Sequence, residues 1–147
     1  MDNVVASVTG YFASNRPADV LAAYVFGSHA GGRAHRESDV DVAVLLDHGI
    51  SERAIRSLHG VRLNADLVAA THVNAVDVVI LNDAPAELSA AVVRRGIRVY
   101  CADEQADHDF VRTAQLLDCD LQPFLRRARR RKLERMIGGR TGPHPQV

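Results

Sequence analysis

Two acidic residues and one Gly-Ser pair have the types and spacing that could do chemistry. Gly27-Ser28 is followed by ten residues and then by Asp39-Val40-Asp41. In an extended strand the side chains at positions i and i+2 point the same way, so Asp39 and Asp41 share one face of an otherwise apolar segment. Neighbouring carboxylates repel each other and are costly to desolvate, and a bound divalent cation would remove that conflict. Oxygen ligands of this kind predict Mg²⁺, with Mn²⁺ as an alternative.

A third acidic residue, Asp77, interrupts another strand-like run of valine and isoleucine. If that strand lies beside the one that holds Asp39 and Asp41, three carboxylates converge on one patch. Such a patch can hold two metal ions about 3.5–4 Å apart, the arrangement used for in-line displacement at a phosphoryl group. We therefore predict Asp39, Asp41 and Asp77 as catalytic residues and metal ligands, with two Mg²⁺ ions as cofactors.

Gly27 and Ser28 predict the phosphate-binding half of the site. A strand that ends in Gly-Ser presents backbone N–H groups and a hydroxyl, which suit the β- and γ-phosphates of a nucleoside triphosphate. Glycine lets the backbone approach closely because it has no side chain. Each feature alone has a plainer interpretation: a common turn, a solvated Asp-x-Asp edge, or a strand-end aspartate. Their joint occurrence favours nucleotidyl transfer.

The elements that must position these residues follow from the hydrophobic pattern of the chain. Apolar β-branched runs predict strands, and helical spacing with glycine and proline boundaries predicts helices. The predicted helices cover Val4–Ser14, Glu52–Ala70, Ala86–Arg95 and about Glu104–Ile137, with Pro123 as a potential break, and the predicted strands cover Val20–Phe26, Ser38–Leu46, Ala75–Leu81 and Ile97–Cys101. The segment Ala30–Arg36 is predicted as a loop.

Two of these helices carry predicted apolar packing sides. In the second helix that side comprises Ala54, Ile55, Leu58, Val61, Leu67 and Val68, and in the last helix it comprises Phe124, Leu125, Leu133, Met136 and Ile137. The last helix also contains a basic cluster over Arg126–Arg135. That cluster is either a solvated helix face or a surface for an acidic partner.

The order of elements predicts an α/β (α+β) fold, with a mixed sheet of about four strands, helices packed mainly on one side and a helical C-terminal extension. We expect a single domain over residues 1–137, followed by a disordered tail over residues 138–147 that is rich in glycine and proline.

The composition narrows the class of protein. The 147 residues are 47% hydrophobic and carry no formal net charge, which indicates a globular protein without an obvious nucleic-acid or membrane partner. No apolar run approaches a membrane span, and the acidic N-terminus does not fit a signal peptide, so we expect a cytoplasmic location. Cys101 and Cys119 lack zinc-site spacing and are expected to be reduced thiols.

The segment VFGSHAGGRAHRESDVDVAVLLD resembles the signature of the polymerase-beta-like nucleotidyltransferase superfamily. The segment VDVVILNDAPAELSAAVVRRGIRVYCAD and the short chain are similar to its minimal nucleotidyltransferase (MNT) branch. The resemblance covers about Val20 to Asp103 and implies the polymerase-beta-like nucleotidyltransferase fold. It implies that Gly27 and Ser28 bind the triphosphate of ATP, and that Asp77 completes the metal site and helps to deprotonate the acceptor hydroxyl.

One residue departs from the pattern of the superfamily. His29 follows Gly-Ser at a position where many relatives carry arginine. Arg33 or Arg36 would then have to supply the positive charge near the phosphates.

Minimal nucleotidyltransferases of this kind are commonly antitoxins paired with HEPN-domain ribonuclease toxins. The resemblance implies transfer of AMP from ATP to a tyrosine hydroxyl of such a toxin, a protein partner and not a nucleic acid. Two alternatives stay open: an aminoglycoside-type adenylyltransferase, for which about 45 residues after the last strand is lean as a substrate domain, and a binding antitoxin that acts by occlusion. Nucleic-acid binding by the basic cluster is a weaker third alternative.

Overall fold

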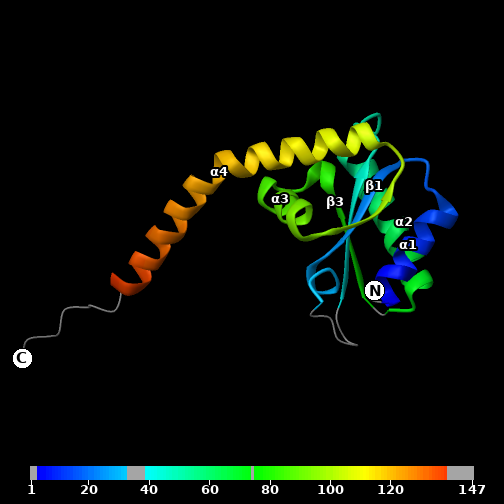
Figure 1. Ribbon diagram of the computed structural model, residues 1–147, viewed down its shortest axis with the longest axis horizontal. Coiled ribbons are helices and arrows are strands. Elements are labelled where there is room, and N and C mark those ends of the chain that lie inside the picture. Colours follow the sequence, from blue (N-terminus) through cyan, green and yellow to red (C-terminus); the bar gives the residue numbers. More distant parts are fainter. Residues whose placement is uncertain (1–2, 33–38, 74, 139–147) are drawn as a thin grey trace, which may run out of the picture.

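The structure is a computed structural model that describes residues 3–32, 39–73 and 75–138 (Figure 1). Its helices are α1 (Asn3–Asn15), α2 (Arg53–Thr71), α3 (Ala86–Arg95) and α4 (Glu104–Gly138), its short 3-10 helices are η1 (Gly27–His29) and η2 (Leu81–Asp83), and its strands are β1 (Val20–Phe26), β2 (Val40–Leu46), β3 (Val76–Ile80) and β4 (Ile97–Cys101). Every helix and strand expected from the sequence is present, with ends within two residues of the prediction. Most of the predicted loop, from residue 33 onward, and the predicted tail after Gly138 lie outside the described residues.

The four strands form one mixed sheet in the order β3-β2-β1-β4. Strand β1 is antiparallel to both of its neighbours, β2 and β4, whereas β2 and β3 are parallel. The end of β1 and the beginnings of β2 and β3 therefore lie at the same end of the sheet. This edge of the sheet is where the residues singled out for chemistry come together.

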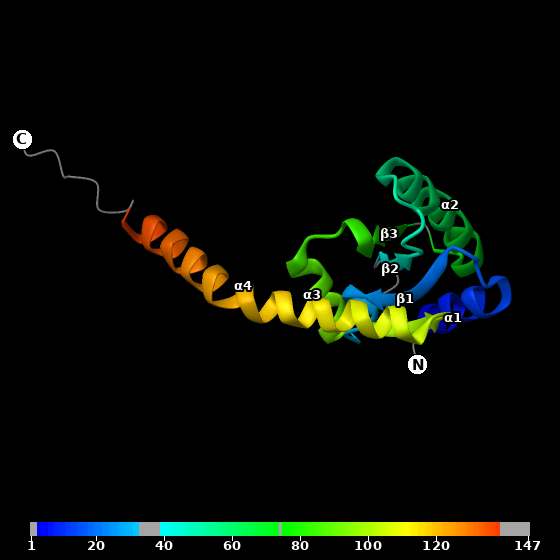
Figure 2. The same cartoon turned by 90° about the horizontal axis from the view of Figure 1, so that it is seen from above.

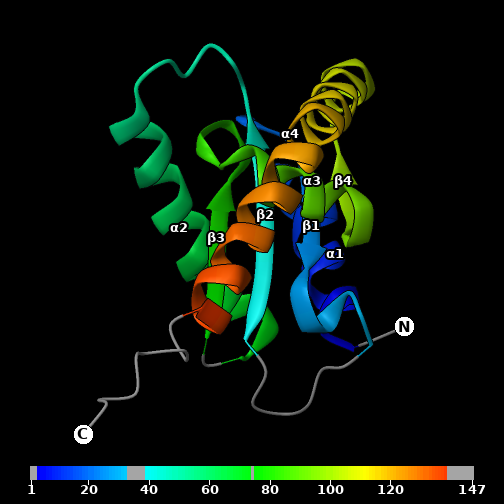
Figure 3. The same cartoon turned by 90° about the vertical axis from the view of Figure 1, so that its left-hand side faces the viewer.

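The helices cover both faces of the sheet, two on each, and not mainly one face as the sequence predicted. Helices α1 and α2 pack on the face that presents Val42 and Val44, while α3 and α4 pack on the face that presents Ala43 and Leu45. Figure 2 shows the strands between α2 on one side and α3 on the other, and Figure 3 shows the sheet nearly face-on, with its strands in the order given above. The physical reason lies in the central strands: β1 and β2 are apolar at almost every position, so both of their faces must be removed from water.

Helix α2 buries only part of the predicted packing side: Leu67 is in the core and Val68 packs against it, as predicted. Its buried residues are Gly60, Leu63 and Leu67, whereas Ile55, Leu58 and Val61 are exposed. Gly60 faces β3 so closely that a Cβ atom there would lie 3.3 Å from the Cδ1 atom of Ile80. The glycine in the middle of the helix is thus a close-packing residue, which helical spacing alone does not reveal.

Helix α4 packs on the domain through its first half and extends away from it in its second half (Figures 1 and 2). The helix continues through Pro123, although proline lacks the N–H that would bond the preceding turn. Contrary to the predicted packing side, Phe124, Leu133, Met136 and Ile137 are all exposed.

Candidate active site at the ends of three strands

Asp41 of β2 and Asp77 of β3 lie side by side on adjacent parallel strands. They are direct partners in the β2–β3 register, and adjacent strands lie about 4.8 Å apart. The neighbouring residues show which face they occupy: Val40, Val42 and Val76 belong to the core beneath α1 and α2. Asp41 and Asp77 alternate with these valines and therefore lie on the opposite face, the one that carries α3 and α4.

Asp39 lies one residue before β2 and is exposed, and its charge acts on Asp41. The structure thus brings together all three aspartates expected from the sequence, at one edge of the sheet. It describes their positions, while their roles as metal ligands and catalytic groups stay predictions. Arg33 and Arg36, which were considered as phosphate ligands, lie outside the described residues.

Gly27 joins the Gly-Ser turn to the carboxylates. Phe26 at the end of β1 pairs with Asp41, and Gly27 follows with a positive φ of 72° at the start of η1. A Cβ atom at Gly27 would lie 2.3 Å from the Oδ2 atom of Asp41, a distance that no side chain could occupy without a shift. Glycine is therefore required here for two reasons, its backbone conformation and its contact with the Asp41 carboxylate.

Burial and neighbouring charge both act on Asp41. Desolvation raises the pKa of the Asp41 carboxyl above its usual range, and the negative charges of Asp77 and Asp39 raise it further. The imidazole of His29 opposes this shift and lowers the pKa of Asp41. His29 itself is buried, with 6% of its surface exposed, and this role beside the carboxylates was not evident from the sequence.

These residues fit a divalent cation. Three carboxylates lie at one sheet edge, one of them is disfavoured in its charged form, and a cation would compensate that repulsion. All the donors are oxygen atoms, which Mg²⁺ and Mn²⁺ prefer.

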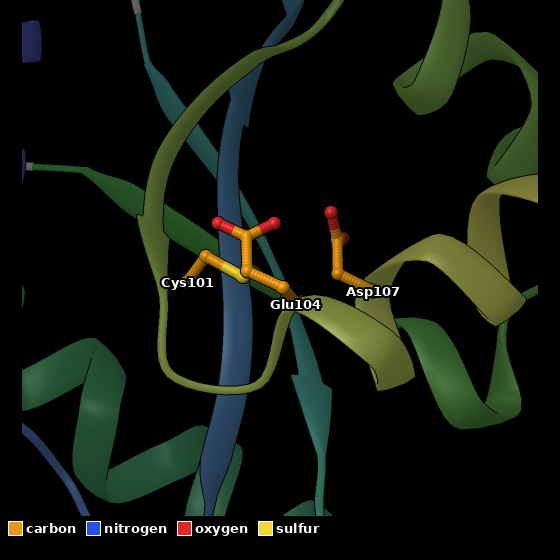
Figure 4. A group of neighbouring side chains, drawn as sticks. All are labelled: Cys101, Glu104 and Asp107. Carbon is orange, nitrogen blue, oxygen red and sulfur yellow. The ribbon is translucent and has the colours of Figure 1, made fainter.

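A second group of potential metal ligands lies where β4 leads into α4. Cys101, Glu104 and Asp107 have ligand atoms within 4.8 Å of one another (Figure 4). The guanidinium of Arg98 already binds both acids, with its NH1 group 3.0 Å from Oε2 of Glu104 and 2.9 Å from Oδ2 of Asp107. Asp107 also accepts a hydrogen bond from the hydroxyl of Tyr24.

The chemistry of this second group is that of an ion pair and not of a metal centre. The positive charge of Arg98 occupies the position that a cation would need, and the hydrogen bonds that Arg98 donates to both acids raise its pKa. Burial and the same acids raise the pKa of the Cys101 thiol, which disfavours the thiolate that binds metals. The network instead joins the first turn of α4 to β1 and β4.

A cavity of about 730 Å³ lies on the same face of the sheet, at the other end of β2. Leu45, Leu81 and Phe110 form part of its apolar wall, and Asp103 and Asp109 are among its polar residues. Leu45 is four residues from Asp41, or roughly 13 Å along an extended strand. The cavity is therefore separate from the three aspartates.

A protein-family model matches most of the chain. The family model described as "Polymerase beta, Nucleotidyltransferase" matches residues 8–105, which include both predicted motifs. The chain belongs to this nucleotidyltransferase family. This confirms the resemblance seen in the sequence, the predicted fold and the assignment as a nucleotidyltransferase enzyme. No curated protein sequence matches the chain significantly.

Solved structures of MNT antitoxin complexes share the fold. One, described as a toxin–antitoxin with AMP-PNP, is 26% identical with a TM-score of 0.62, covering 87% of this chain and 98% of that chain. Another is the tri-AMPylated Shewanella oneidensis HEPN toxin in complex with MNT antitoxin, 23% identical with a TM-score of 0.56, covering 85% and 95%. A third, described as the toxin–antitoxin MntA–HepT, is 22% identical with a TM-score of 0.57, covering 87% and 98%.

No helix in the described part of the chain is both long enough and apolar enough to cross a membrane. The two cysteines are free thiols, as expected.

Proposed function

We propose that this nucleotidyltransferase moves AMP from ATP to a tyrosine hydroxyl of a HEPN-domain ribonuclease toxin and thereby acts as its antitoxin. The observation that carries the proposal is the pairing of Asp41 with Asp77 in adjacent parallel strands, with Gly27 packed against the Asp41 carboxylate. This arrangement combines a concentration of negative charge, which calls for metal ions, with a turn that lacks side-chain bulk.

In the proposed mechanism Asp39, Asp41 and Asp77 hold the metal ions, with two Mg²⁺ expected and Mn²⁺ as a substitute. When bound, the ions lower the pKa of the acceptor hydroxyl and stabilise charge on the departing pyrophosphate. The turn at Gly27 and Ser28 binds the triphosphate through backbone N–H groups and the serine hydroxyl. Asp77 is exposed, and in this proposal its carboxylate accepts the proton of the incoming hydroxyl.

The transfer reaction forms one P–O bond and breaks another. The tyrosine oxygen attacks the α-phosphorus of ATP, its proton leaves to a base, and the bond from the α-phosphorus to the bridging oxygen of pyrophosphate breaks. The chain contributes mainly positioning and electrostatic stabilisation, as is usual for phosphoryl transfer.

Similarity to antitoxin complexes supports a protein as the acceptor. This chain is 26% identical to the matching chain of the complex with AMP-PNP. The match covers 87% of this chain and 98% of that chain, so the two share nearly their whole length. AMP-PNP is an analogue of ATP, which favours ATP as the nucleotide donor. A HEPN toxin carrying AMP groups in the Shewanella oneidensis complex favours a toxin hydroxyl as the acceptor.

Intact-mass spectrometry of the toxin tests this proposal. The purified chain, incubated with ATP, Mg²⁺ and its cognate toxin, should add one or more AMP masses to the toxin. Asp41→Ala should abolish the transfer, and Ser28→Ala should slow it by about 10–100-fold because one hydrogen bond to a charged phosphate is lost. Asp19→Asn is the matched control, since Asp19 is an exposed aspartate near the opposite end of β1 and should leave transfer unchanged.

The alternatives give different results in the same experiment. A toxin that is inhibited by both the wild type and the Asp41→Ala variant, with no added mass, would establish neutralisation by occlusion. Transfer of AMP to an aminoglycoside with no transfer to the toxin would establish a small-molecule adenylyltransferase. Either result would replace the proposed protein acceptor.

A further inference from the structure

Helix α2 is apolar on two opposite sides. Its inner side, with Gly60, Leu63 and Leu67, packs against the sheet. At 3.6 residues per turn, a second stripe runs along the side directly opposite. This outer stripe consists of Ala54, Ile55, Leu58, Val61, Ala65 and Ala69.

All six residues of the outer stripe are exposed. Ile55, Leu58 and Val61 are 44%, 51% and 66% exposed, and the three alanines are also exposed. From Ala54 to Ala69 the stripe is about 22 Å long. Figure 2 shows α2 at the outside of the molecule, remote from α4.

An outer stripe of this kind is unusual for a helix on the surface of a monomer. Surface helices normally present charged and polar residues opposite their buried side, and a helix that is apolar all round is a buried helix. Continuous apolar patches on a protein surface mark sites that another surface covers. The outer side of α2 therefore has the composition of an interface.

The stripe is complementary to itself. Its large residues, Ile55, Leu58 and Val61, lie in the N-terminal half, and its alanines at 65 and 69 lie in the C-terminal half. An antiparallel pair of α2 helices related by a two-fold axis places large residues of one copy over alanines of the other. Val61 then faces Ala65, and Leu58 faces Ala69, which is the interdigitation that close helix packing requires.

The charges at the edge of the stripe are complementary in the same arrangement. Arg62 and Asp66 lie one turn apart on the same long edge of α2, and both are exposed. In an antiparallel pair the same edges meet, so Arg62 of each copy comes near Asp66 of the other. Asp66 already accepts a hydrogen bond from Tyr11 at 3.1 Å, and a carboxylate retains further lone pairs for a guanidinium.

We propose that a second copy of this chain covers the outer side of α2, through an antiparallel, two-fold α2–α2 contact centred between Val61 and Ala65. The contact leaves the three aspartates accessible, because α2 and the aspartates lie on opposite faces of the sheet. One pair of helices buries less area than a standard interface of about 1,600 Å², so the dimer has a dissociation constant in the micromolar range.

Sedimentation velocity of the chain alone, without toxin, tests the dimer. Between about 1 µM and about 500 µM the wild type should change from monomer to dimer. Leu58→Asp should weaken dimerisation at least tenfold, because two carboxylates would enter an apolar contact. Leu116→Asp is the matched control: Leu116 is an exposed leucine on α4, 59% exposed, and its substitution should leave the dimer intact.

A charge exchange tests the register of the pair. Arg62→Asp and Asp66→Arg should each weaken the dimer, because each places like charges opposite one another. The double variant restores opposite charges and should recover most of the lost affinity. Circular dichroism should show the same helix content for all variants, since the substituted residues are exposed.

Cross-linking provides a readout that does not depend on affinity. Val61→Cys protein mixed with Ala65→Cys protein, both with Cys119→Ser, should give a disulfide-linked dimer under mild oxidation with diamide. Leu116→Cys mixed with Ala65→Cys should not. A chain that stays monomeric throughout the concentration range, or a dimer unaffected by Leu58→Asp, would overturn the proposal. If the wild-type chain is monomeric and the Leu58→Asp variant no longer binds the toxin, this side of α2 is the toxin-binding surface instead.

Discussion

At the scale of single residues, the site is a compromise between stability and function at Asp41. Its carboxyl is partly desolvated and faces the negative charges of Asp77 and Asp39, so its folded-state pKa is raised. A carboxyl with a raised pKa binds its proton more tightly in the folded state than in the unfolded state. Stability is therefore lost as pH rises from the pKa of this carboxyl in the unfolded state through its higher pKa in the folded state. At neutral pH the ionised carboxylate destabilises the folded protein.

Replacing Asp41 by the neutral, nearly isosteric Asn should relieve this repulsion. In the presence of a metal chelator at neutral pH, we expect Asp41→Asn to raise the melting temperature by about 1–3 °C. The gain should disappear as pH falls below about 4, where the wild-type carboxyl is protonated in both states. Addition of Mg²⁺ and ATP should stabilise the wild type but not the variant.

Thermal melts monitored by circular dichroism measure this effect, with Asp19→Asn as the control that should show no gain. A large loss of stability in Asp41→Asn at neutral pH would mean that the carboxylate has a structural role. In that case the metal-binding interpretation of the acidic patch would have to be abandoned.

At the scale of the secondary-structure elements, α4 is fixed to the sheet by one buried polar network. Asp107, with 4% of its surface exposed, binds the Tyr24 hydroxyl of β1 and the Arg98 guanidinium of β4. Burial and the adjacent carboxylate both raise the pKa of Tyr24, which therefore stays protonated and donates this hydrogen bond. Glu104 binds the same Arg98 but is exposed.

The two acids of this network should therefore contribute very differently to stability. Asp107→Leu leaves the buried hydroxyl of Tyr24 without its acceptor and removes one of the two carboxylates that bind Arg98, so it should lower the free energy of unfolding by about 2–3 kcal/mol. Glu104→Gln removes only an exposed ion pair and should change it by less than about 0.5 kcal/mol. Urea unfolding monitored by circular dichroism measures both values, and equal effects would show that the network does not anchor α4.

The elements themselves were predictable from the sequence, but their partners were not. Valine-rich runs and glycine or proline boundaries locate each helix and strand within two residues. The acids were predictable too, because Asp39, Asp41 and Asp77 interrupt apolar strands. Spacing cannot say which side of an apolar helix is buried, however, and α2 is apolar on both sides. The pairing of Tyr24 with Asp107 joins residues 83 positions apart, and no local pattern signals it.

At the scale of the whole molecule, charge is divided between the domain and the outer half of α4. Residues 1–120 contain 17 acidic and 10 basic residues, whereas residues 121–147 contain 1 acidic and 8 basic residues. Arg126, Arg127 and Arg131 are exposed and belong to the second half of α4, the half that extends from the domain (Figure 1). The net charge of zero is thus the sum of an acidic domain and a basic C-terminal segment. We call the part of α4 from residue 121 onward the basic arm.

A basic arm of this kind should accelerate encounter with an acidic partner. Like charges along α4 repel one another, and the exposed ion pairs Arg129–Glu87 and Arg130–Glu134 offset part of this repulsion. An acidic surface on the proposed toxin would compensate the remaining charge and speed association at low salt. Charge reversal by Arg127→Glu with Arg131→Glu should lower the association rate for the toxin about tenfold at low salt, and the difference should shrink as salt screens the charges.

Surface plasmon resonance at several salt concentrations separates this effect from others, because it gives association and dissociation rates separately. Arg16→Glu with Arg112→Glu is the matched control, since both arginines are exposed and lie outside the basic arm. ATP binding should be unchanged in both double variants, because the three aspartates lie on the sheet and not on α4. If the arm variant binds the toxin at the wild-type rate even at low salt, the arginines only solvate the helix, and the acidic partner must contact another surface.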